Sequence, residues 1–193
     1  MKATPFILAS ASPRRVELLQ QLVADFEVVP SDAPEVHDPQ LTAWEMAQVN
    51  AYRKARVVAK KWPDAIVLAA DTLVYLDRET KLFGKPTSRA DAQCMLSELQ
   101  GRMHAVITGV CLLHLRAHRQ SVFAEWTDVK FHPLTPKQIK EYLSQINPLD
   151  KAGAYAIQEH GERIVAEISG SYSNVVGLPL ERVREELGAW QRA

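Results

Sequence analysis

Near the N-terminus, residues 6–15 read FILASASPRR, the most informative stretch of the chain for its fold. Its first four residues are apolar and predict a short buried strand, and the small residues after them predict a turn. Ser12 then stands at the expected N-cap of a helix and Pro13 at the first helical position, where the missing proline N–H breaks no helical hydrogen bond. The stretch therefore predicts a strand that passes through a serine-rich turn directly into a helix.

Two arginines, Arg14 and Arg15, fall in the first turn of that helix. The helix dipole disfavours a cation there by ~0.3–1 kcal/mol each. An anion bound by the free backbone N–H groups and both guanidinium groups would reverse this penalty. Ser10 and Ser12 lie in the same turn and are further candidate contacts. We therefore interpret the turn as a phosphate site, with two solvated arginines on an ordinary helix as the alternative.

Strand and helix patterns alternate along the rest of the chain. Capping residues predict further helix starts at Thr42, Ser88 and Thr135. Apolar or alternating runs predict strands at residues 26–30, 65–70, 73–76, 104–115, 121–131 and 164–168. Residues 77–80 read as a hairpin turn into a return strand. The alternation favours an α/β or mixed-sheet architecture in a single domain over residues 1–193.

The composition restricts the class of protein. Of 193 residues, 47% are hydrophobic and 24% charged, which is typical of a globular domain with one core. A formal net charge of zero argues against broad nucleic-acid binding. Cys94 and Cys111 lie in apolar surroundings and predict small core residues rather than a disulfide. Neither a membrane-spanning run of ~20 apolar residues nor a signal-peptide pattern is found, so we expect a cytoplasmic protein with no membrane partner.

Asp71 interrupts one of the most apolar stretches of the chain. Residues 65–70 precede it and Leu73–Leu76 follow, so its backbone is expected near the core. A carboxylate there must be paired, metal-bound or protonated, because an unpaired buried charge is costly. The functional interpretation is a metal ligand or general base. An aspartate that bonds its own turn at a strand bulge is the alternative.

Other polar residues are weaker candidates when taken singly. Lys85 stands between a glycine and a proline, which restrict the direction of its stem and suit a phosphate contact. Lys54 lies on an alanine-rich helix and Glu35 in an acidic loop, and a solvated surface explains each as well. Gln158 ends the small-residue stretch 150–158, and its amide can pair with a nucleobase edge. A tight sheet crossing is the alternative for that stretch.

Taken in order, these motifs resemble the Maf family of nucleoside triphosphate pyrophosphatases nearly end to end. The resemblance is carried by residues 8–15, 17–19, 51–55, 70–72, 84–86, 101–108, 150–158 and 170–180. It implies a Maf/inosine-triphosphatase-like mixed sheet with flanking helices and two lobes around a substrate groove. It also implies hydrolysis of a nucleoside triphosphate at the α-phosphate, which yields a monophosphate and pyrophosphate, with a divalent cation, Mg²⁺ or Mn²⁺, as cofactor.

The resemblance assigns roles residue by residue. Asp71 matches the catalytic carboxylate, described as the proton acceptor, and Asp71 and Glu35 are the candidate metal ligands. The residues expected to bind substrate are Arg14, Arg15, Lys54, Thr72, Lys85 and Gln158. Among them, those at 14, 72 and 158 resemble the subgroup that acts on dTTP and UTP rather than the 7-methyl-GTP subgroup. Ala156 and Glu159 depart from glycines usual in the subgroup and bear on the base preference.

Two alternatives stay open at this point. The same chemistry could act on modified pyrimidine triphosphates or 7-methyl-GTP. The chain could instead be a nucleotide- or nucleic-acid-binding regulator of cell division without turnover, although zero net charge and the intact set of site residues weigh against it. A phosphatase releasing inorganic phosphate lacks a recognisable nucleophile motif. We expect the nucleotide to be the partner and expect no stable binding of nucleic acid. The apolar surface helices, together with the family resemblance, are compatible with a homodimer.

Overall fold

The computed structural model describes residues 4–76 and 81–192, apart from the side chain of Gln191. The chain divides into two compact units. Unit 1 comprises Met1–Asp71, Thr108–Glu125 and Gly177–Ala193, and unit 2 comprises Thr72–Ile107 and Trp126–Val176. Each division falls within or beside a regular element, so three long strands contribute residues to both units.

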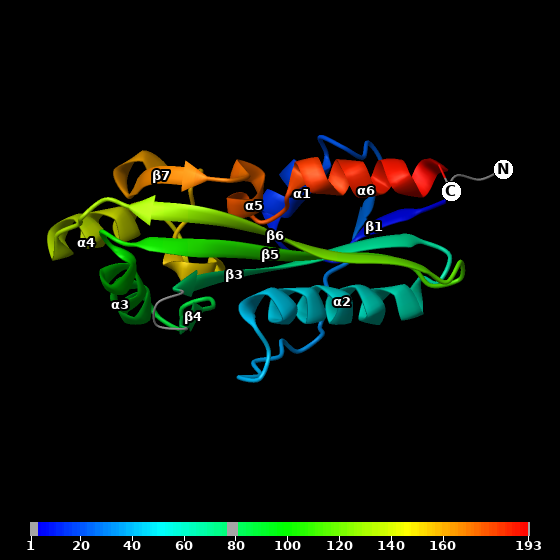
Figure 1. Ribbon diagram of the computed structural model, residues 1–193, viewed down its shortest axis with the longest axis horizontal. Coiled ribbons are helices and arrows are strands. Elements are labelled where there is room, and N and C mark those ends of the chain that lie inside the picture. The colour runs from blue at the N-terminus through cyan, green and yellow to red at the C-terminus, as the bar shows by residue number, and fades with distance from the viewer. Residues whose placement is uncertain (1–3, 77–80, 193) are drawn as a thin grey trace. The chain divides into compact units, whose positions relative to one another are not determined.

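The described residues form a mixed seven-stranded sheet in the order β2-β1-β3-β5-β6-β7, with β4 paired to β3 (Figure 1). The strands are β1 (Phe6–Leu8), β2 (Glu27–Val28), β3 (Ile66–Leu76), β4 (Lys81–Phe83), β5 (Met103–His114), β6 (Arg119–Phe131) and β7 (Val165–Ser169). β1 is parallel to both β2 and β3, whereas β4 and β7 run antiparallel to their partners. The predicted mixed α/β architecture is confirmed.

Four helices, α1 to α4, begin where the capping residues predict, and α5 and α6 follow near the C-terminus. They are α1 (Pro13–Leu19), α2 (Ala43–Lys61), α3 (Arg89–Leu99), α4 (Pro136–Gln145), α5 (Tyr172–Val176) and α6 (Leu180–Arg192). Thr42 and Thr135 each close a reciprocal capping box with the residue three positions on, and Ser88 accepts from the Asp91 N–H. Ser12 is the N-cap of α1, although its side chain makes no capping bond. Among the described residues, no helix combines the length and apolarity needed to cross a membrane.

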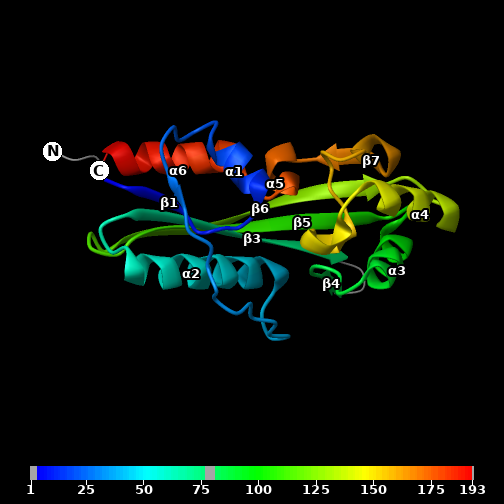
Figure 2. The same cartoon turned by 180° about the vertical axis from the view of Figure 1, so that it is seen from behind.

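In unit 1, α2 covers one face of the sheet, and α1 and α6 cover the other (Figures 1 and 2). The inner side of α2 is rich in alanine, and Ala47, Ala51 and Ala55 are fully buried. Small side chains let the helix backbone approach the sheet closely. A Cβ on Gly109 of β5 would lie 2.2 Å from the Ala47 carbonyl oxygen, so only glycine permits this distance. The close approach sets the height of α2 above the strands that carry the site.

Unit 2 has its own apolar core. Helix α3 packs against α4, and the core beneath them includes Phe131 and Tyr142. His104, Phe131 and Tyr155 pack edge to face, with ring centroids 4.7 to 5.6 Å apart. The His104 ring is 2% exposed, and burial lowers its pKa to about 4, so it is neutral at physiological pH.

Two local expectations change. β3 runs without a break through Asp71 and Thr72, so the predicted interruption is wrong: ladder pairing and tertiary partners keep a polar residue in the strand. Cys111 is buried and its pKa is raised to about 12 by burial, but Cys94 is exposed on α3 rather than in the core. Residues 150–158, for which the sequence leaves a loop or an irregular strand open, follow the loop alternative, with short 3₁₀ turns at Pro148–Asp150 and Ala152–Ala154. The return strand β4 is confirmed, and its turn, residues 77–80, lies outside the described residues.

Candidate functional site

Asp71 is a buried strand residue whose two carboxylate oxygens have different partners. It is 4% exposed on β3. Oδ1 accepts from the Lys54 ammonium at 2.5 Å, and Oδ2 accepts from the Asn50 amide at 3.2 Å. The expectation that this carboxylate must be paired is therefore met by two donors from one helix. Because both oxygens are engaged, the plane of the carboxylate is set by α2.

Lys54 joins two acidic residues from different segments. Its Nζ donates to Asp71 Oδ1 at 2.5 Å and to Glu35 Oε1 at 2.8 Å. The Asp71 side chain is 5% exposed, that of Lys54 15% and that of Glu35 41%. We call these three residues the Lys54 cluster. The Lys54 ammonium thus links the buried carboxylate on the strand to an exposed carboxylate at the surface. In this position the ammonium could leave the two acids and pair with an incoming anion.

Asn50, one helical turn before Lys54, is a site residue that the sequence interpretation missed. Its Oδ1 accepts from the Val36 N–H at 2.7 Å, and its Nδ2 donates to the Val36 carbonyl at 3.3 Å as well as to Asp71. Asn50 is 1% exposed. One signal in the sequence could have found Asn50. Asn50 and Lys54 are polar residues on a helix face that is otherwise lined by alanines at i, i+3 and i+4 spacing.

The serine-rich turn before α1 orders the arginines. Ser10 is buried, and its Oγ accepts from the Ser12 N–H at 3.1 Å and from Arg15 Nη1 at 3.4 Å. Arg15 Nε donates to the Gly177 carbonyl at 2.8 Å, which ties the turn to the segment that precedes α6. The predicted strand–turn–helix is thus confirmed, and the conformation of Arg15 is set by two neighbours.

The arginines and the acids share one electrostatic environment. Burial lowers the pKa of the Arg15 guanidinium, the negative charge of Asp71 raises it, Arg14 lowers it and Glu35 raises it. Arginine nonetheless stays charged at any physiological pH. The structure therefore brings together in unit 1 the predicted residues Ser10, Ser12, Arg14, Arg15, Glu35, Lys54 and Asp71.

The remaining predicted residues belong to unit 2. Thr72 is half-buried on β3, and Lys85 and Gln158 are exposed. The Gly153 N–H donates to the Gly84 carbonyl at 3.0 Å, so the loop of Lys85 is tied to the stretch that ends in Gln158. The small residues of that stretch fit the sheet: a Cβ on Gly153, whose φ is +67°, would lie 2.9 Å from Val74.

Glu159, one of the two departures beside Gln158, is engaged by a lysine. Lys151 is 4% exposed, and its Nζ donates to Glu159 Oε1 at 3.1 Å, to Asp150 Oδ1 at 2.9 Å and to the Asn147 carbonyl at 2.8 Å. We call Lys151, Asp150 and Glu159 the Lys151 cluster. The ion pair neutralises the carboxylate next to Gln158. The other departure, Ala156, is buried, and its N–H and carbonyl both bond the Tyr142 hydroxyl.

The two candidate metal ligands suit a hard divalent cation that is shared with a substrate. Asp71 and Glu35 converge on the same Lys54 Nζ, so their carboxylates already face one position of positive charge. The described residues contain no group of three or more His, Cys, Asp or Glu placed to hold a metal. Mg²⁺ is commonly bound by one or two carboxylates plus waters and substrate phosphates, and this donor set fits that chemistry.

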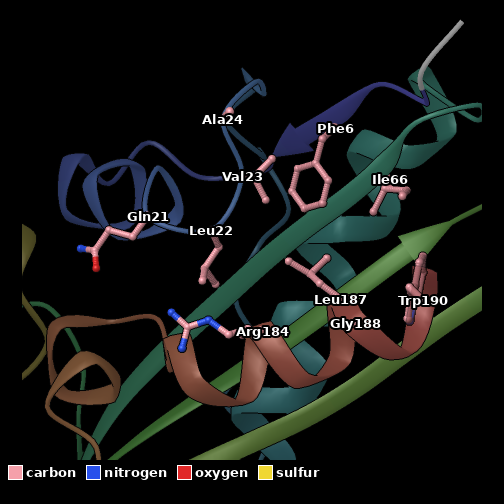
Figure 3. A pocket seen from close by; sticks show the side chains of 10 residues that line it. All are labelled: Phe6, Gln21, Leu22, Val23, Ala24, Ile66, Arg184, Leu187, Gly188 and Trp190. Atoms are coloured by element: carbon pink, nitrogen blue, oxygen red, sulfur yellow. The ribbon is translucent and has the colours of Figure 1, made fainter. Parts of the chain in front are cut away.

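A separate cavity of about 580 Å³ lies in unit 1 beside β1, β3 and α6 (Figure 3). Apolar side chains line most of it, with Arg184 and Gln21 as its polar groups (Figure 3). Its lining, within the part of the chain that the structure describes, includes none of the predicted site residues. The cavity and the Lys54 cluster are therefore distinct features of the unit.

Comparisons with known proteins find relatives in sequence and in fold. The family model described as "Maf-like protein" matches residues 5–190. The chain is 45% identical over 185 residues to a protein of Carboxydothermus hydrogenoformans named dTTP/UTP pyrophosphatase, which covers 95% of this chain and 97% of that protein. It is 47% identical over 186 residues to a Gloeobacter violaceus protein of the same name, covering 96% of each. The solved structure of the Staphylococcus aureus Ham1 protein shares the fold, with a TM-score of 0.57 at 15% identity over 96% of this chain and 98% of that one.

Proposed function

This chain belongs to the Maf family, and on that premise we propose that it hydrolyses dTTP and UTP to the nucleoside monophosphate and pyrophosphate. Relatives named dTTP/UTP pyrophosphatase match it over nearly their whole length at 45 to 47% identity. The observation that carries the proposal is the Lys54 cluster, a buried carboxylate linked through a lysine to an exposed one. Such a carboxylate is suited to act on a water molecule beside a bound phosphate.

Unit 1 offers part of the positive charge that a triphosphate needs. Its substrate carries roughly four negative charges, and phosphoryl-transfer sites depend on positioning and on neutralising that charge. Arg14 and Arg15 lie at the start of α1, and Lys54 lies between the acids. We assign these residues, with Ser10 and Ser12, to binding of the phosphates. Thr72, Lys85 and Gln158 of unit 2 are proposed substrate-binding residues because they match the family's motif positions.

Asp71 is the proposed catalytic residue. When the phosphates draw the Lys54 ammonium away, Oδ1 of Asp71 becomes available to a water molecule. That water attacks the α-phosphorus in line with the bridging oxygen, its proton passes to Asp71, and the bond to the β-phosphate breaks as pyrophosphate leaves. General-base catalysis of this kind contributes ~10²–10⁴-fold. Mg²⁺ or Mn²⁺, held by Asp71 and Glu35 with the substrate phosphates, would add positive charge to stabilise the leaving pyrophosphate.

Base selection is proposed to rest on Gln158, whose amide can both donate to and accept from a pyrimidine edge. The Lys151 cluster supports this assignment because the ion pair with Lys151 holds Glu159 next to Gln158. We also propose that residues 1–193 form one Maf-like domain that acts in the cytoplasm. We further propose that the protein binds no nucleic acid stably and forms a homodimer. Light scattering of the purified protein would test the homodimer.

Product analysis tests the function directly. The chain would be incubated with dTTP, UTP, CTP, GTP and 7-methyl-GTP, with Mg²⁺ or with EDTA, while pyrophosphate and inorganic phosphate are measured separately. We expect pyrophosphate and monophosphate from dTTP and UTP with Mg²⁺, and neither product with EDTA. Pyrophosphate from another nucleotide would overturn the specificity but keep the reaction. Nucleotide binding without any pyrophosphate would contradict the proposed function.

A further inference from the structure

Asn50 is a buried amide whose polar atoms are used by two different segments. It lies on the alanine-rich inner side of α2 and is 1% exposed. A buried amide is costly unless it is hydrogen-bonded. Both polar ends of this one have partners, since Oδ1 accepts from the Val36 N–H and Nδ2 donates to the Val36 carbonyl and to Asp71 Oδ2. The burial of Asn50 therefore depends on the loop and the strand keeping their positions.

Asn50 and Lys54 act on the same two segments. They are four residues apart on α2 and thus lie on one helix face. Lys54 bonds Oδ1 of Asp71 and Asn50 bonds Oδ2, so the carboxylate cannot rotate without losing one of them. Lys54 also holds the Glu35 side chain, and Asn50 holds the backbone of Val36, the next residue. The five residues Asn50, Lys54, Asp71, Glu35 and Val36 form a closed ring through helix, loop and strand.

We propose that Asn50 is a positioning residue that sets the separation of Asp71 and Glu35. Its two bonds to the Val36 backbone fix the loop, and its bond to Asp71 fixes the carboxylate, so one side chain aligns both acids. We call the bonds of Asn50 to Val36 and to Asp71 the clamp. Its expected effect on kcat rests on the proposed function, whereas its effect on the loop can be measured without activity. Residues that orient catalytic or metal-binding groups typically change activity or metal affinity ~10–100-fold when lost. Phosphate binding by the α1 turn does not depend on Asn50.

The test compares Asn50→Leu with Val58→Ala. Leucine is close to asparagine in size and removes every hydrogen bond of the amide. Val58 is a matched control, because it is 1% exposed on the same helix and its truncation lowers stability without removing a polar contact of the ring. Asn50→Asp provides a second variant that keeps an acceptor for the Val36 N–H but places a carboxylate against Asp71. Measurements are kcat and KM for dTTP, thermal unfolding, and amide hydrogen exchange of residues 31–40.

We expect Asn50→Leu to lower kcat ~10–100-fold with KM changed less than ~3-fold, and to speed exchange of the Val36 amide. Val58→Ala should unfold at a lower temperature with kcat and loop exchange unchanged. If Asn50→Leu does not fold, Asn50→Asp decides: it keeps an acceptor for the Val36 N–H but loses the amide donor to Asp71, so kcat should fall ~10–100-fold while exchange of the Val36 amide stays close to wild type.

Three results would overturn the proposal: for Asn50→Leu, unchanged exchange in residues 31–40 or faster exchange with wild-type kcat, and for Asn50→Asp, a wild-type kcat. If the wild-type chain releases no pyrophosphate, the proposed function has failed, and the exchange data alone decide whether the clamp exists.

Discussion

Each unit contains one lysine held between two carboxylates, but the buried charge differs. In the Lys54 cluster the buried member is an acid: the Asp71 side chain is 5% exposed and its lysine 15%. In the Lys151 cluster the buried member is the lysine, at 4%, while Asp150 and Glu159 are 43% and 40% exposed. Clusters of the same composition are therefore suited to different roles: a buried carboxylate can act as a base on a reacting water, whereas a buried lysine can connect turns.

The hydrogen-bond partners of Asp71 and of Lys151, the buried members of the two clusters, also differ. The Asp71 carboxylate accepts from the side chains of Asn50 and Lys54 on α2, and the Lys54 donor can leave when a substrate competes for it. Lys151 donates to the Asn147 backbone carbonyl as well as to both acids, and its bonds connect the turn at residue 147 with the end of the 150–158 stretch. We interpret the Lys54 cluster as catalytic and the Lys151 cluster as structural.

Replacing the buried acid should have the largest effect. We expect Asp71→Asn to lower kcat for dTTP at least ~10²–10⁴-fold, because the amide cannot accept the water proton. Asp64→Asn is the matched control: Asp64 belongs to unit 1, and its bond to Arg116 joins two side chains that are both more than 60% exposed, at 69% and 67%. Pyrophosphate release and a thermal unfolding curve would be measured for both. A folded Asp71→Asn variant with near wild-type turnover would remove Asp71 from the mechanism.

The two lysines should respond differently when each is replaced by methionine. Lys54→Met leaves the Asp71 carboxylate buried without its cation, and removing one partner of a buried pair typically costs about 3–5 kcal/mol. Lys151→Met leaves acids that are already hydrated and fills the same buried volume, so we expect a loss of about 1 kcal/mol. Urea unfolding at pH 7 compares them. Equal losses of stability, or loss of turnover in Lys151→Met alone, would contradict the assignment of roles.

His104, in the core of unit 2, should make the free energy of unfolding depend on pH, and neither lysine cluster takes part in this effect. Burial lowers the pKa of His104 from 6.5 to about 4. Between these values the unfolded chain binds more protons than the folded one, so the free energy of unfolding should fall as the pH drops from 6.5 to 4. The contribution is complete above 6.5 and amounts to about 3 kcal/mol.

Urea unfolding of wild type and His104→Phe would measure this dependence. The variant should lose that part of the slope, while His132→Gln, at an exposed position, should keep it. A slope unchanged by His104→Phe would show that other groups cause it.

A change in α6 should leave both clusters as they are. Gly188 lies inside this helix, and a Cβ there would meet only the Arg192 Nη1 at 3.4 Å. Gly188→Ala should therefore stabilise the chain by about 0.5–1 kcal/mol, because glycine loses more backbone entropy on folding than alanine does. Thermal unfolding and dTTP turnover check this expectation. A destabilised variant would mean that the cavity wall, which includes Gly188, cannot accept a methyl group.

Local signals predicted the helix starts well and the site only in part. Ser12, Thr42, Ser88 and Thr135 are N-caps in the structure, because a cap is satisfied within its own turn. Asn50 was missed, since its partners lie 14 and 21 residues away in sequence. The short helix α5 was not foreseen either. The exposure of Cys94 depends on which side of α3 faces the core, which its apolar neighbours did not reveal.

The amino-acid sequence alone indicates that strands and helices alternate, that a serine-rich turn opens α1, and that Asp71 needs a partner in an apolar stretch. Periodicity, caps and the cost of a buried charge are properties of short segments, so they can be read without a fold. The packing of distant segments was needed to show that Asp71 continues the strand instead of ending it, and that Lys54 and Asn50 supply its partners. It likewise decided that the Lys151 cluster buries a cation where the Lys54 cluster buries an acid. Burial and pairing depend on which distant segments pack together, and no local pattern carries that information.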